Sequence, residues 1–131
     1  MIKNIQFLDL GIQPLANNYL KFKDLNNKEK KYRLKVGINP KTKLVSINNP
    51  ISGKLMFNDK YPYRSSMSKT MIKSFKDLSK LIKKVYNPSK ILEIGSNDGS
   101  FIKNFSKNKV IGIEPCANVE KITKKLGYNT Y

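Results

Sequence analysis

The sequence predicts an α/β chain in which a small mixed α+β domain precedes the first β-α-β-α units of a parallel sheet. Three observations support this fold class. Short alternating apolar stretches occupy the first half, a helical apolar period starts near Ser66, and two apolar runs then alternate with helix-like segments. Strands alternating with helices are typical of parallel α/β sheets. We expect domains at residues 1–65 and 89–131, joined by a helix over 66–88.

The first domain should contain short strands separated by turns. Gly11 and Pro14 interrupt the first apolar stretch, so we expect an irregular segment there. Apolar residues alternate with basic ones from Tyr32 to Val36, which predicts a strand. A further short strand is expected around Leu44 to Ile47.

The connecting helix is predicted by apolar residues at three- and four-residue spacings from Met67 to Val85. Ser66 or Ser68 can cap its start, and Asn87-Pro88 ends it. Its opposite face carries lysines, which we expect to be solvated.

The last part of the chain reads strand, loop, helix, strand, helix. Its segments are "SKILEIG", "GSFIKNFSK", "KVIGIEP" and "NVEKITKKLG", with Gly127 as the C-terminal cap of the second helix. Only two strands are expected here, so this part predicts the opening of a sheet rather than a complete one.

The loop "EIGSNDG" follows the first of these strands, at the sheet edge where parallel α/β proteins bind ligands. A phosphate-binding P-loop would need a Gly-Lys-Ser/Thr ending, which is absent. The dinucleotide fingerprint fails at Asn97 and at Ser100. The class I S-adenosylmethionine loop, acidic-x-Gly-x-Gly-x-Gly, fits Glu93, Gly95 and Gly99, with Asn97 in place of the middle glycine.

A carboxylate in "GIEP" supports the same cofactor. Glu114 lies about 20 residues after the loop, where a carboxylate typically accepts the ribose hydroxyls of an adenosine cofactor. S-adenosylmethionine has no phosphate, but its ammonium, sulfonium and ribose groups all suit carboxylates. A structural turn with a surface glutamate is the alternative. The predicted cofactor-binding residues are Glu93, Gly95, Ser96, Asn97, Asp98, Gly99, Glu114 and Pro115.

The composition indicates which kinds of binding partner and which cellular compartment to expect. The formal charge is +17, but only two of the basic residues are arginines and the lysines are spread along the chain. We therefore favour a solvated basic surface over an acidic partner or an anionic substrate, and place nucleic-acid binding last. The single cysteine, Cys116, is expected to be a packed residue. No membrane span or signal peptide is recognised, so a cytoplasmic protein is expected.

Three segments together resemble the sugar C-methyltransferase family, S-adenosylmethionine-dependent enzymes that act on keto intermediates of nucleotide-linked deoxysugars. They are "LDLGIQPLANNYL", "LMFNDKYPYRSSMSKTM", and the pair "LEIGSNDGSF" and "GIEPCANV". The resemblance implies a small zinc domain, a central Rossmann-like class I methyltransferase domain and a carboxy-terminal domain. This chain would cover the first part and the start of the second.

The resemblance also implies site residues, and it shows two departures. Tyr61, Tyr63, Ser65 and Ser66 would face the substrate pocket, although the tyrosines could equally be core residues and the serines a helix cap. The family's second CxxC pair falls at Asn39 and Thr42, and no cysteine precedes "LDLG". Zinc is therefore not expected, and packing alone must hold the first domain.

The second departure concerns catalysis. Carbon methylation needs a base that removes a proton α to a ketone. The chain has no histidine, and the family's general base is expected beyond residue 131. The sequence thus predicts the amino-terminal portion of a sugar C-methyltransferase that is inactive alone and has a nucleotide-sugar substrate. The alternatives are a non-catalytic module that binds S-adenosylmethionine or a partner, and a basic RNA-binding fragment.

Overall fold

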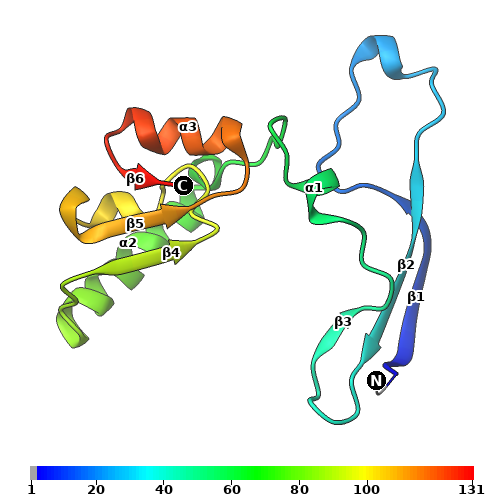
Figure 1. The fold of residues 1–131 in the computed structure, drawn as a ribbon, viewed down its shortest axis with the longest axis horizontal. Helices are drawn as coiled ribbons and strands as arrows, with labels where there is room; N and C mark the ends of the chain where they lie inside the picture. The colour runs from blue at the N-terminus through cyan, green and yellow to red at the C-terminus, as the bar shows by residue number, and fades with distance from the viewer. Residues whose placement is uncertain (1–2) are drawn as a thin grey trace. The chain divides into compact units, whose positions relative to one another are not determined.

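The computed structural model describes residues 3–131, so Met1 and Ile2 of the predicted first domain lie outside the described residues. The chain divides into two compact units, one ending at Met56 and the other running from Phe57 to Tyr131 (Figure 1). No helix within residues 3–131 is long and apolar enough to cross a membrane.

The first unit is built on an antiparallel sheet. Its strands are β1 (Ile5–Pro14), β2 (Lys31–Ile38) and β3 (Val45–Ile47), in the order β1-β2-β3. A 3-10 turn at Phe22–Asp24 and the one-turn helix α1 (Gly53–Met56) complete it. β2 and β3 lie where the alternating pattern and the short apolar run predicted strands.

The expectation of an irregular first segment is wrong, because β1 continues through Gly11 to Pro14. Its pairing with β2 shifts between Gln6 and Leu8 and again between Asp9 and Ile12. Gly11 has a φ of 73°, a left-handed conformation that glycine adopts at little cost. Bulges of this kind insert a residue without ending the strand. Pro14 is accommodated because β1 is an edge strand that ends there.

The first unit lacks the packed interior that we expected to replace zinc. Among residues 3–56 only Gly37 is buried. Large apolar side chains on β1 stay exposed, with Phe7 60% and Ile12 63% accessible. The backbone ladder between β1 and β2, with an ion pair between Arg33 and Asp9 at 2.8 Å, therefore holds this sheet more than apolar burial does.

The first α-helix of the second unit is the predicted one, α2 (Lys69–Val85). Ser68 is its N-cap, because the hydroxyl accepts a hydrogen bond from the Met71 N–H at 3.2 Å. A 3-10 turn at Ser65–Met67 precedes the cap. The helix ends at Val85, and Asn87, with a φ of 39°, leads the chain out before Pro88.

A parallel sheet follows. Its strands are β4 (Ile91–Ile94), β5 (Val110–Ile113) and β6 (Asn129–Thr130), side by side in that order (Figure 1). Helix α3 (Ala117–Lys125) joins β5 to β6. It ends in a Schellman motif at Gly127, whose φ is 81°, with the Tyr128 N–H bonded to the Thr123 carbonyl. The sequence analysis missed β6, because two polar residues carry no strand pattern.

The helix predicted after the loop is also absent as an α-helix. Two 3-10 turns, Ile102–Asn104 and Lys107–Lys109, occupy that segment. The Asn104 side chain donates hydrogen bonds to the Ser100 and Phe101 carbonyls, at 3.1 and 2.8 Å. The side-chain amide therefore competes with backbone N–H groups for these two carbonyls, which a longer helix would use as acceptors, so the segment stays short.

One face of the parallel sheet is covered and the other is not. The core consists of Ile102, Phe105 and Val110, with Ile82 of α2 and Ile91 of β4 packed against it. The alternate residues of β4 and β5 form the other face of the sheet, which is exposed and consists of Leu92, Ile94, Ile111 and Ile113. Parallel sheets are normally covered on both faces, so this half-covered arrangement is unusual.

Replacing Ile102 with alanine should destabilise the protein by about 2–5 kcal/mol, because this fully buried side chain would leave a cavity in the only apolar core of residues 3–131. Leu92→Ala is the matched control, since Leu92 is 60% exposed, and it should cost about 0.5 kcal/mol or less. Urea unfolding followed by circular dichroism measures both. Equal losses in the two variants would contradict the assigned core.

Candidate functional site

The loop after β4 has the backbone conformation of a three-glycine loop. Gly95, Asn97 and Gly99 all have left-handed φ values, of 76°, 48° and 76°. Asn97 thus adopts the conformation of the middle glycine, as its tolerance of this region predicts. The N–H groups of Gly95 and Ser96 bond to the Ile113 carbonyl, at 2.8 and 3.0 Å, and fix the loop to the end of β5.

The two glycines meet different surroundings. A Cβ atom on Gly95 would have nothing within 4 Å, so the backbone there is open to an approaching ligand. A Cβ atom on Gly99 would lie 2.5 Å from the Thr123 methyl group on α3. Gly99 is therefore required by close packing against α3, and Gly95 by the left-handed turn alone.

Glu114 links the loop after β4 to the loop that follows β5, at this edge of the sheet. Its side chain follows β5 and is buried. Oε2 accepts a hydrogen bond from the Asn97 N–H at 2.8 Å, and Oε1 accepts one from the Cys116 N–H at 2.8 Å. The carboxylate therefore lies beside the loop, as its spacing predicted, and one oxygen contacts each loop. Pro115, next to it, is exposed.

Glu93, the acidic residue that begins the motif, lies beneath the loop. Its Oε2 is buried and has no hydrogen-bond partner among the described residues. Burial raises the pKa of this carboxyl to about 7, with a smaller contribution from the Asp98 and Glu114 carboxylates. A hydrogen bond from the Ile102 N–H opposes the shift. The side chain is thus a carboxyl that gains or loses its proton near neutral pH.

Two hydroxyl groups share the surroundings of Glu93. Glu93, Gly112 and Thr130 are paired in one row across the three strands. A Cβ atom on Gly112 would lie 2.7 Å from Ser96 Oγ and 3.2 Å from Thr130 Oγ1, so both hydroxyls reach this row. Both are buried without a hydrogen-bond partner among residues 3–131. A polar layer therefore lies under the loop, on the covered face of the sheet.

Asp98 is buried and faces the segment that precedes α2. It accepts hydrogen bonds from Ser100 Oγ at 2.6 Å and from the Ser66 N–H at 3.0 Å. Burial pushes the pKa of Asp98 upward, but the hydrogen bonds from Ser100 and Ser66 outweigh it and hold the pKa below its usual value. Asp98 is therefore an ionised acceptor at neutral pH.

Residues 61–66, which we call the strap, lie against the loop. The Ser65 N–H donates to Asn97 Oδ1 at 2.9 Å, and Asn97 Nδ2 donates to the Tyr63 carbonyl at 3.4 Å. Asn118 Nδ2 donates to the Tyr61 carbonyl at 2.9 Å. The four residues that the resemblance assigned to the substrate thus meet the loop and α3 chiefly through main-chain groups of the strap, and the Ser66 side chain also bonds to Asp98.

The side chains of the strap differ in exposure. The Tyr61 ring lies 5.6 Å from the Phe57 ring, and Tyr63 is 42% exposed. Ser65 is buried and Ser66 is exposed. Tyr61 is half-buried and Tyr63 is exposed, so neither ring is a buried core residue, and their contact with a substrate stays a prediction. Sequence reasoning missed Asn118, for which a residue of poor helix propensity near the start of a helix was the only signal.

Cys116 is a packed thiol, as expected. It is 1% exposed, and burial together with the nearby Glu114 carboxylate raises its pKa to about 11. A thiol that stays protonated at neutral pH is a poor nucleophile.

The residues in place of a zinc ligand pair form a turn. Asn39 Oδ1 accepts hydrogen bonds from the N–H groups of Lys41 and Thr42, both at 3.0 Å, and Thr42 Oγ1 accepts one from the Leu44 N–H at 3.3 Å. No group of three His, Cys, Asp or Glu residues that could hold a metal occurs within residues 3–131. The side chains present here therefore do not fit a zinc ion.

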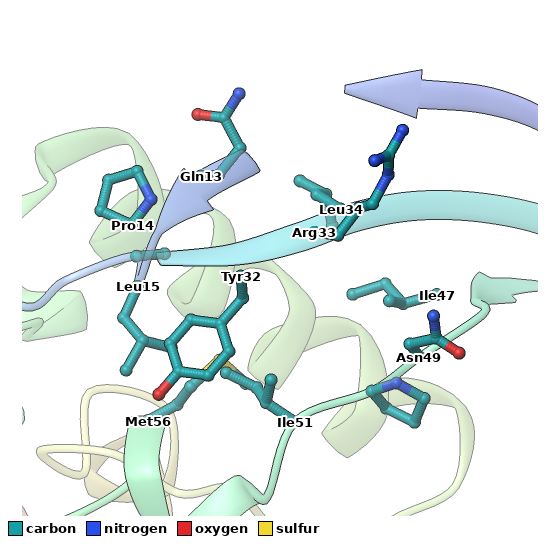
Figure 2. Close-up of a pocket in the computed structure, with 12 residues that line it drawn as sticks. Gln13, Pro14, Leu15, Tyr32, Arg33, Leu34, Ile47, Asn49, Ile51 and Met56 are labelled. Atoms are coloured by element: carbon teal, nitrogen blue, oxygen red, sulfur yellow. The ribbon is translucent and has the colours of Figure 1, made fainter. Parts of the chain in front are cut away.

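The first unit contains a cavity of about 270 Å³, far along the chain from the loop (Figure 2). Its lining combines the end of β1, the start of β2 and the segment after β3 with α1, and the Tyr32 ring, Leu15, Ile51 and Met56 point into it. The lining is almost entirely apolar and holds no set of polar groups that could perform chemistry. We regard the cavity as an incompletely filled interior.

The raised pKa of Glu93 gives a pH dependence of stability. The folded state keeps its proton up to about pH 7, whereas an unfolded glutamate loses it near 4.5. The contribution of Glu93 to stability is therefore full below about pH 4.5 and is lost as the pH rises through 7. The free energy of unfolding should fall mainly between about pH 4.5 and 7 in the wild type. Because the chain has no histidine, Glu93→Gln should nearly abolish that slope. An unchanged slope would contradict the assignment.

Asn39→Ala should speed amide exchange at Lys41 and Thr42 by about 3–10-fold, because each N–H loses an acceptor worth roughly 1 kcal/mol. Lys41→Ala, in the same turn, is the control and should leave the exchange at Thr42 nearly unchanged. We also expect a chelator such as EDTA to leave the melting temperature of the wild type unaltered. A lower melting temperature with EDTA would contradict the metal-free turn.

Comparison with known proteins relates the amino-terminal part of the chain to methyltransferases. Residues 3–57 match a methyltransferase family model described as a "putative zinc binding domain". A search of curated proteins finds no match to this chain. The matched segment includes the antiparallel sheet and the turn at Asn39. The first unit is thus similar to a methyltransferase-associated domain, although its described residues lack a metal-binding group.

Proposed function

We propose that the chain is part of an S-adenosylmethionine-dependent C-methyltransferase that acts on a nucleotide-linked keto-deoxysugar, and that the loop after β4 binds the methyl donor. The single observation that carries this proposal is the left-handed backbone at Gly95, Asn97 and Gly99, joined through the Asn97 N–H to Glu114. The methyltransferase-related match of residues 3–57 supports it independently.

The chemistry of the loop suits this cofactor better than a nucleotide phosphate. The loop contains carboxylates and no lysine or arginine, so a phosphate would meet negative charge. Each oxygen of Glu114 accepts one main-chain hydrogen bond and keeps acceptor capacity for a ribose hydroxyl. The open space at Gly95 allows close approach of a ligand to the backbone. Ser96, Asp98 and Pro115 complete the proposed surroundings.

When bound, S-adenosylmethionine supplies an electrophilic methyl group. The proposed tasks of this chain are to hold and orient the cofactor through Glu93, Glu114 and the loop, and to place the strap, with Tyr63, on the substrate side. The carboxylates of Asp98 and Glu114 are engaged by main-chain N–H groups, and the chain has no histidine. These residues therefore provide binding, and we do not assign the base for proton removal to any of them.

A second candidate is a non-catalytic module that binds S-adenosylmethionine, favoured because Asp98 and Glu114 are engaged by main-chain N–H groups and the chain has no histidine. Both candidates predict cofactor binding. They differ in whether methyl transfer to a nucleotide-linked keto sugar is detected in the complete protein. An RNA-binding fragment is the third candidate, and it predicts binding that weakens steeply with salt.

Calorimetric titration with S-adenosylhomocysteine tests the shared step. We expect saturable binding that weakens about 10–100-fold in Glu114→Ala, because a charged acceptor at the ribose position is lost. Glu120→Ala is the matched control, since Glu120 lies on α3 and pairs with Lys124, and it should bind as the wild type does. Absence of binding by a wild-type chain that circular dichroism shows to be folded would overturn the cofactor proposal.

A further inference from the structure

Asn97 stands where a glycine would be the simplest solution. Its φ of 48° lies in the left-handed region, which costs most side chains roughly 1–2 kcal/mol and costs glycine nothing. Asparagine tolerates this region better than most residues but less freely than glycine, so an offsetting interaction favours its presence here. Its side chain supplies one, because the amide spans from the loop to the strap.

The side-chain amide of Asn97 contacts two main-chain groups of the strap. Oδ1 accepts from the Ser65 N–H at 2.9 Å, and Nδ2 donates to the Tyr63 carbonyl at 3.4 Å. The first bond has good geometry, whereas the second is long and weak. Oδ1 is thus the atom that holds the strap. A glycine at this position would preserve the loop and lose the strap contact.

Neighbouring contacts give the strap a defined path. Asp98 accepts from the Ser66 N–H, and Asn118 donates to the Tyr61 carbonyl. Within the strap, Arg64 Nη1 donates to the carbonyls of Tyr61 and Tyr63, at 2.7 and 2.9 Å. The two ends of the strap are therefore held by other side chains, and Asn97 holds its middle, next to the exposed Tyr63.

The main chain of Asn97 contacts the carboxylate of the proposed cofactor site. Its N–H donates to Glu114 Oε2 at 2.8 Å, and its carbonyl accepts from Thr123 Oγ1 at 3.4 Å. One residue thus contacts Glu114 through its backbone and the strap through its side chain. Movement of the strap and movement of the loop at Glu114 cannot be independent while these bonds persist.

We propose that Asn97 is a positioning residue whose side chain fastens the strap to the loop, and so couples the placement of Tyr63 to the site at Glu114. The fastening rests on the contacts above and does not depend on which ligand the loop takes. The coupling to a ligand rests on the proposed function. Coupling between two sites is reciprocal, so a ligand at Glu114 should in turn protect the strap.

Amide hydrogen exchange measured by NMR at Ser65, in the full chain, tests the fastening. Asn97→Gly keeps the left-handed backbone and removes the side chain, and exchange at Ser65 should rise by about 10-fold. Asn97→Asp keeps an acceptor oxygen in a residue that also tolerates left-handed φ, and it should restore most of the protection. Asn87→Gly is the matched control, because Asn87 also has a positive φ but lies beyond α2, and it should leave Ser65 unchanged.

Unchanged exchange at Ser65 in Asn97→Gly would overturn the proposal, as would equal exchange in Asn97→Gly and Asn97→Asp. Addition of S-adenosylhomocysteine to the wild type should slow exchange at Ser65 and Ser66, and this slowing should be lost in Asn97→Gly. Failure of the wild type to bind S-adenosylhomocysteine would overturn the proposed function, whereas faster exchange in Asn97→Gly alone would still support the fastening.

Discussion

The second unit depends on the Glu114 carboxylate, which accepts one main-chain N–H from the loop after β4 and one from the start of α3. Charge-assisted hydrogen bonds of this kind are stronger than neutral ones, and in a buried position water competes little for the donor and the acceptor. The bonds fix Asn97, and Asn97 fixes the strap. Glycine at positions 95 and 99 permits the turn, and hydrogen bonds to the Glu114 carboxylate and the Ile113 carbonyl hold it in place.

The parts of the fold that follow a period were predictable from the sequence. β2, α2, β4, β5 and α3 appear where alternation or helical spacing placed them, and the left-handed loop follows from its residues. Position-specific effects were not predictable. The bulge that carries β1 past Gly11, and the Asn104 side chain that keeps the segment after the loop short, each depend on single hydrogen bonds or pairings.

The sequence predicted which residues lie at the candidate site, but it did not predict the hydrogen bonds between them. Spacing brought Glu114 to the loop, but it gave no indication that both oxygens would be engaged by main-chain groups. The strap contacts the loop mostly through backbone atoms, and a sequence pattern does not specify which backbone groups pair over a long distance. Asn118 was missed for the same reason, because its partner is the Tyr61 carbonyl.

The exposed sheet face has a consequence for the colloidal behaviour of the protein. Leu92, Ile94, Ile111 and Ile113 attract apolar surfaces at contact distance, whereas the +17 formal charge repels other copies over longer distances. Salt shortens the reach of that repulsion, to about 10 Å at 0.1 M, and leaves the apolar attraction in place. Ionic strength, rather than any change in conformation, therefore determines whether two molecules come close enough for their exposed sheet faces to make contact.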